Sequence, residues 1–146
     1  ETADYLINEK AKKASDRGIQ VQIHAEYPRN TSIRSVDLCA ILGNLLDNAL
    51  EAAGQVSETD QRFIRLTIRR IHQMLVIKVE NSFSTTPIQK DGVFQTTKRE
   101  PGLHGWGLKS AQTAAEKYDG MVRTSCEGTV FRAVATLSWH GVSTEI

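Results

Sequence analysis

Apolar and polar positions follow a helical period in three parts of the chain. In residues 3–17, small and aliphatic side chains recur every third or fourth position, which predicts an amphipathic helix. The strongest helical pattern covers residues 36–53, and Ser35 or Asp37 is its expected cap. A third helix is predicted over residues 108–118, where a glycine and an acidic residue follow the last apolar position.

Elsewhere the period is two, which is typical of half-buried strands. Residues 19–25 alternate in this way and predict one strand. Residues 64–68 and 75–79 alternate on either side of a short polar connection, so they predict an antiparallel hairpin. A second hairpin is predicted from residues 121–125 and 129–138, which flank a glycine.

Residues 81–107 show no sustained period and contain two prolines and four glycines. A segment of this length without regular structure is rare in a compact domain, and it is usually a functional loop or lid. The order of elements predicts an α+β fold, a two-layer sandwich in which helices cover one face of a mixed, mostly antiparallel sheet. At 146 residues the chain, 1–146, is expected to form a single domain.

Composition narrows the class of protein. The net charge is +1, from 18 basic and 17 acidic residues, which argues against a nucleic-acid-binding partner. The two cysteines, Cys39 and Cys126, form no metal or disulfide motif and indicate a reducing compartment. No apolar run is long enough to cross a bilayer, so we expect a cytoplasmic domain without membrane contact. The start at Glu1, without a signal pattern, suggests a fragment of a longer protein.

Polar side chains form a stripe on the helix of residues 42–53. Asn44 and Asn48 lie four residues apart and share one face, with Asp47 and Glu51 beside them. Asparagine is a poor helix former, so two on one face contribute little to stability. An amide oxygen is a suitable ligand for Mg²⁺, which takes few protein oxygens and completes its shell from phosphates and water. The alternative is an ordinary solvent-facing surface.

A glycine-rich loop precedes the third helix. Its glycines are Gly102, Gly105 and Gly107. Such glycines let backbone N–H groups approach phosphate oxygens, and the helix N-terminus adds a favourable dipole. The spacing is not that of a dinucleotide-binding loop, and Leu108 stands between the last glycine and Lys109, unlike a P-loop. A nucleotide lid and a flexible surface loop both fit this pattern.

Five segments in this order resemble a known family: NLLDNALEA (44–52), VIKVENS (76–82), VFQTTK (93–98), HGWGLKS (104–110) and GTVFRAVATL (128–137). Together they are similar to the catalytic ATP-binding domain of sensor histidine kinases, in the GHKL superfamily. The resemblance covers nearly the whole chain and implies a Bergerat-type ATP-binding fold. It is greatest to the peptide-sensing branch of Gram-positive bacteria, in which an asparagine motif replaces the adenine-box Asp-x-Gly-x-Gly.

The resemblance assigns roles to individual residues. It makes Asn48 the Mg²⁺ ligand, with Asn44 near the metal and the phosphates, and these two are the expected catalytic residues. Asn81 falls where most members have the aspartate that accepts a hydrogen bond from the adenine amino group. The other expected contacts with ATP are Asp47 of the polar stripe and Phe94, Thr97, Lys98, His104, Gly105, Gly107, Leu108, Lys109 and Thr129.

Hydrolytic members of the superfamily carry a glutamate where this chain has Asn44, and an amide cannot act as a general base. The resemblance therefore implies transfer of the γ-phosphoryl group to a protein side chain. None of the four histidines has the surroundings of a phosphoacceptor, so the acceptor is expected in a helical dimerisation domain upstream of Glu1. The implied parent is a homodimer, anchored in the bacterial plasma membrane, whose further partner is a response regulator.

Two other functions remain open. One is a protein-serine kinase of the same fold, of the anti-sigma type. The other is a non-catalytic module that senses nucleotide or docks another protein, because the Asp-x-Gly-x-Gly motif is missing.

Overall fold

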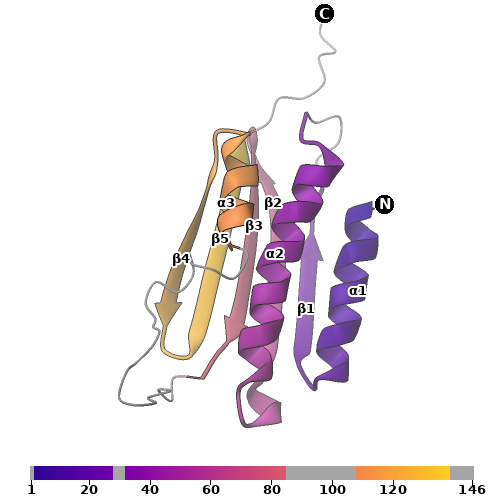
Figure 1. Cartoon of the computed structure of the whole chain (residues 1–146), viewed down its shortest axis with the longest axis vertical. Helices are drawn as coiled ribbons and strands as arrows, with labels where there is room; N and C mark the ends of the chain where they lie inside the picture. The colour runs from indigo at the N-terminus through magenta and orange to yellow at the C-terminus, as the bar shows by residue number, and fades with distance from the viewer. Residues whose placement is uncertain (1, 28–31, 85–107, 139–146) are drawn as a thin grey trace, which may run out of the picture.

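The computed structural model describes residues 2–27, 32–84 and 108–138. Three α-helices, one short 3-10 helix and five strands make up this part of the chain (Figure 1). In chain order they are α1 (Thr2–Asp16), β1 (Gln20–Ala25), α2 (Ser35–Gly54), the short 3-10 helix η1 (Thr59–Gln61), β2 (Phe63–Ile71), β3 (Met74–Ser82), α3 (Leu108–Glu116), β4 (Met121–Glu127) and β5 (Val130–Ser138).

The strands form one sheet in the order β1-β2-β3-β5-β4. β1 runs parallel to β2, while every other neighbouring pair is antiparallel. In Figure 1 all three helices lie on the same face of the sheet, with α2 between α1 and α3. The predicted two-layer α+β architecture with a mixed, mostly antiparallel sheet is therefore confirmed.

The core lies between α2 and the sheet, where the apolar face of the helix packs against the apolar face of the strands. Alternate residues of the central strands, such as Leu66 and Ile77, are at most 1% exposed, and so are Ile41 and Leu45 of α2. The strand positions between them face the other side of the sheet, which no described helix covers. The alternation that predicted β2 and β3 thus reflects one buried and one open face.

Three local expectations were wrong. Neither Ser35 nor Asp37 caps α2: Arg34 occupies the N-cap position without a side-chain cap hydrogen bond, and Asp37 is buried within the first turn. The first two residues of the segment predicted to lack regular structure, Asn81 and Ser82, belong to β3. The edge strand β1 is more exposed than its pattern suggested, with Ile23 at 43% exposure.

Gly120 separates α3 from β4, and no side chain fits at this position. A Cβ atom built there would lie 1.7 Å from the carbonyl oxygen of Thr136 on β5. The backbone also pairs across this corner, since Ser138 donates its N–H to the carbonyl of Tyr118 at 2.9 Å. The close approach of backbone to backbone explains why α3 ends in a glycine turn.

Candidate functional site

Asn44 and Asn48 lie half-buried on the flank of α2 that faces α3. The orientation follows from Asp37, which precedes Asn44 by seven residues, about two helical turns. The carboxylate of Asp37 is bonded to Lys117 and Tyr118, which directly follow α3. Both amides therefore lie on one side of the helix, as predicted, but neither projects freely into solvent.

Asp47 lies on the other flank of α2. Its carboxylate Oδ1 accepts a hydrogen bond from the Lys10 ammonium on α1 at 2.7 Å. This ion pair was missed in the sequence because its two partners are 37 residues apart. A direct contact of Asp47 with a nucleotide stays a prediction, and the structure gives this residue a role in joining α1 to α2.

Asn81 is 1% exposed near the end of β3. It shares its side of the strand with Val79 and Ile77, so it lies on the helix-covered face. Its amide Nδ2 donates to the carbonyl of Ser82 at 2.8 Å. Its Oδ1 is buried and accepts no hydrogen bond from any described residue. A buried acceptor without a donor is unfavourable, so this oxygen is suited to a donor supplied by a ligand.

The turn between β4 and β5 comes close to the same place. The carbonyl of Thr129 accepts a hydrogen bond from the backbone N–H of Phe83 at 2.9 Å, and Asn81 pairs with Phe131 across the sheet. Thr129 is itself exposed. The structure therefore brings Thr129 to the end of β3 that carries Asn81, although the two residues are far apart in sequence.

α3 begins at Leu108, whose side chain is completely buried in the core. Lys109, the next residue, is exposed. Leu108 thus fixes the first turn of the helix, and a contact of its backbone with phosphate stays a prediction. The other predicted lid contacts lie outside the described residues: Phe94, Thr97, Lys98, His104, Gly105 and Gly107.

The chemistry of the described side chains bears on how a metal ion could bind. Within residues 2–27, 32–84 and 108–138, no group of three or more histidine, cysteine or carboxylate side chains could hold one. Mg²⁺ does not require such a group, because it keeps water and phosphate oxygens in its shell. The amide oxygens of Asn44 and Asn48 fit a site in which a nucleotide supplies most of the ligands.

Asp37 was expected only as a helix cap, and the structure shows a different role. Hydrogen bonds from Tyr118 and Lys117 hold the pKa of its carboxyl below the ordinary value, although burial opposes this shift. Burial and the bond to Asp37 raise the pKa of Tyr118. The Tyr118 hydroxyl also accepts the N–H of Arg34 at 3.0 Å. These bonds tie the start of α2 to the end of α3, and no local pattern could reveal contacts between residues 80 positions apart.

Across the described ranges, no helix is both long enough and apolar enough to cross a membrane.

The family comparison gives a match over most of the chain. A family model described as the GHKL domain matches residues 33–137, from just before α2 to the last but one residue of β5. All the described candidate residues lie within this range. No curated protein matches the sequence.

Several solved structures share the fold. The catalytic domain of the histidine kinase ThkA has a TM-score of 0.66 at 20% identity, with 92% of each chain covered. A histidine kinase from Burkholderia phymatum has a TM-score of 0.71 at 22% identity, covering 94% of this chain and 67% of the other. The Acinetobacter baumannii histidine kinase AdeS has a TM-score of 0.61 at 16% identity, covering 92% and 64%. At these identities the likeness concerns the fold.

Proposed function

Because the chain belongs to the GHKL domain family, we propose that it binds Mg-ATP and donates the γ-phosphoryl group to a histidine. The acceptor is on a separate dimerisation and phosphoacceptor domain of a two-component sensor kinase. The proposed site lies on the helix-covered face of the sheet, between the Asn44–Asn48 flank of α2 and the end of β3. Residues of the predicted lid complete it.

The observation that carries the proposal is the unpartnered Oδ1 of Asn81. This oxygen is buried on the same face of the sheet as α2, near the turn that holds Thr129. The hydrogen bond from Nδ2 to Ser82 orients the amide so that its acceptor remains available. An exocyclic amino group of adenine would supply the donor that the described residues do not.

The metal is assigned to the asparagine pair. Asn48 is the proposed Mg²⁺ ligand and Asn44 its neighbour one turn away, with phosphate and water oxygens completing the coordination shell. When bound, Mg²⁺ would neutralise charge on the phosphates. The protein's own contribution is to position the nucleotide and to exclude alternative orientations, which is the main task in phosphoryl transfer.

The positions of the carboxylates on α2 support transfer of the phosphoryl group to a protein rather than hydrolysis of ATP by water. Asp37 is bonded to Tyr118 and Lys117, and Asp47 is paired with Lys10. Glu51 is exposed and follows the proposed metal ligand by almost one turn. None of these carboxylates occupies the place of Asn44, where hydrolytic relatives are expected to carry a water-activating glutamate. An amide at that place cannot take a proton from water.

The acceptor histidine is proposed to lie in another domain. Of the described histidines, His24 is on the exposed edge strand β1 and His72 is in the tight turn between β2 and β3. Neither is on a helix. From the resemblance of its sequence motifs, we further propose a parent protein of the peptide-sensing branch, dimeric and membrane-anchored, that passes the phosphoryl group to a response regulator.

Calorimetric titration of the chain with Mg-ATP tests the first half of this proposal. Saturable binding by the wild type, lost in Asn48→Ala, is the expected result. A parent protein that contains both domains tests the second half, with γ-labelled ATP. Acid-labile label on a histidine supports the kinase, label on serine supports the anti-sigma type, and no binding at all indicates a docking module.

A further inference from the structure

We propose that Lys10 is a positioning residue for the metal site, because it ties α1 to the helix that carries Asn44 and Asn48. The inference rests on the proposed function, since it concerns the same Mg-ATP site. It adds an element, the amino-terminal helix, that the ligand-contacting residues do not include.

The ion pair between Lys10 and Asp47 is placed next to the proposed metal ligand. Lys10 Nζ lies 2.7 Å from Asp47 Oδ1. Asp47 directly precedes Asn48 and follows Asn44 by three residues. The ion pair with Lys10 therefore restrains the turn of α2 that carries both amides.

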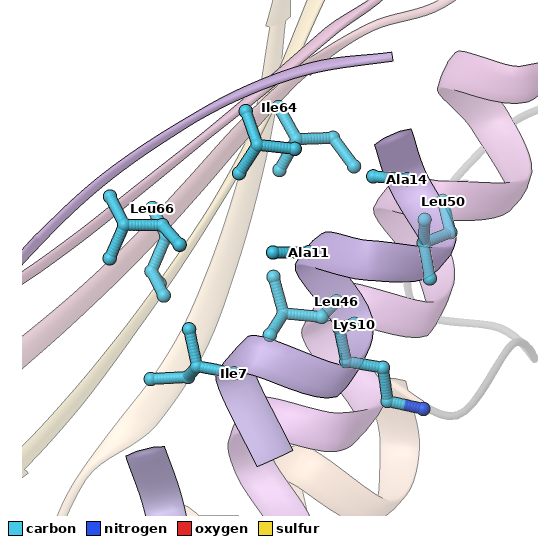
Figure 2. A pocket seen from close by; sticks show the side chains of 10 residues that line it. Ile7, Lys10, Ala11, Ala14, Leu46, Leu50, Ile64 and Leu66 are labelled. Atoms are coloured by element: carbon cyan, nitrogen blue, oxygen red, sulfur yellow. The ribbon is translucent and has the colours of Figure 1, made fainter. Parts of the chain in front are cut away.

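The lysine is held more firmly than an ordinary surface lysine. Its side chain is only 13% exposed, whereas that of Asp47 is 61% exposed. Lys10 is one of the residues that line an apolar groove between α1, α2, β1 and β2. In Figure 2 its carbon chain runs beside α2, and its nitrogen points away from Ile64 and Leu66. Ile7, Leu46 and Leu50 line the groove near it. Burial of the carbon chain restricts the lysine, so the ammonium reaches Asp47 from a defined direction.

The same groove lies between α1 and the sheet, and α1 contacts α2 more extensively than it contacts the strands. Its wall on β1 includes Ile23, which is 43% exposed, and the lining is apolar apart from the end of Lys10. The position of α1 therefore depends strongly on its contacts with α2.

A second contact lies one turn earlier on α2. Leu6 of α1 lies beside Gly43, where an added Cβ would be 3.9 Å from the Leu6 Cδ2 atom. α1 thus contacts α2 at Gly43 and Asp47, and each of these residues directly precedes one of the two asparagines. A displacement of α1 is transmitted to both amides, so the position of α1 controls how well they bind the metal.

Lys10→Met tests this inference, because methionine retains an unbranched apolar side chain and removes the charge. We expect Mg-ATP affinity to fall by about fivefold, within the range of couplings transmitted through packed elements. The midpoint of a Mg²⁺ titration at fixed ATP should rise by a similar factor. The affinity for ATP without Mg²⁺ should not change, which separates an effect on the metal site from general loosening.

Two matched variants complete the experiment. Lys10→Arg keeps the ion pair and should restore the wild-type Mg²⁺ midpoint. Lys13→Met removes an exposed lysine from the same helix and should have no effect. Thermal unfolding checks that each variant is folded at the temperature of the titration.

The outcomes are distinguishable. If the wild type binds Mg-ATP and Lys10→Met binds it equally well, the positioning role is refuted and the proposed function stands. Equal losses in Lys10→Met and Lys13→Met, or equal losses with and without Mg²⁺, also refute the role. Failure of the wild type to bind Mg-ATP refutes the proposed function and, with it, the inference.

Discussion

Replacing Asn81 by leucine should weaken nucleotide binding without weakening the fold. Leucine keeps the branching of asparagine at Cγ but has neither polar atom. Loss of the bond from Nδ2 to the Ser82 carbonyl should cost about 0.5–1.5 kcal/mol. Removal of a buried acceptor that no described residue satisfies should regain about 1–3 kcal/mol. The free energy of unfolding is therefore expected to change by between about −0.5 and about +2.5 kcal/mol, a net gain over most of this range.

Urea unfolding measures the stability of the variant, and calorimetry measures its affinity for Mg-ATP. We expect Asn81→Leu to match or exceed the wild-type stability and to bind Mg-ATP at least about tenfold more weakly, the loss typical when a binding hydrogen bond is removed. Ser82→Ala is the matched control, because Ser82 is also buried and its hydroxyl accepts the N–H of Phe63 at 2.9 Å. That variant should lose about 1 kcal/mol of stability and keep its affinity.

The opposite pattern would refute this reasoning. If Asn81→Leu were clearly less stable than the wild type and still bound Mg-ATP normally, Asn81 would be a structural residue. Its unpartnered oxygen would then have no connection with the nucleotide.

Three further predictions concern the metal site, a buried carboxyl and a backbone corner. Asn48→Ala should abolish Mg-dependent nucleotide binding while the circular dichroism spectrum stays that of the wild type, and unchanged affinity would contradict the metal assignment. The Asp37 carboxyl, bonded to Tyr118, has a pKa below its ordinary value of 3.8. Its ionised form therefore favours the folded state above that value, and this stability is lost as pH falls from there through the lower folded pKa. Acid unfolding of Asp37→Asn should lack this part of the pH dependence, and an identical profile would argue against it. Gly120→Ala should destabilise the domain by at least about 2 kcal/mol in urea unfolding, because its Cβ would overlap the Thr136 carbonyl; a neutral result would contradict the backbone geometry.

The elements could be predicted from the sequence where one face is buried and the other is open. β2 and β3 alternate clearly because their residues divide between the core and the uncovered side of the sheet. The prediction stopped before the end of β3, where Asn81 and Ser82 are polar but buried. Hydrophobic periodicity cannot identify a buried polar residue, so the strand looked shorter than it is.

Only part of the candidate site could be predicted from the spacing of residues in the sequence. The shared flank of Asn44 and Asn48 follows from helical spacing, and the structure confirms it. The partners of Asp37 and Asp47 do not follow from spacing, because they belong to other parts of the chain at sequence separations of 81 and 37 residues. Which of several neighbouring carboxylates remains available to a ligand is decided by tertiary contacts.

The parallel pairing of β1 with β2 has a consequence for the order of folding. The hairpins β2–β3 and β4–β5 close through short turns, so their contacts can form early. β1 can pair with β2 only after the intervening chain, including all of α2, has crossed over the sheet. The entropy of closing that long loop makes the pairing a late step. We therefore expect α1 and β1 to dock last onto a nucleus made by α2 and the antiparallel strands.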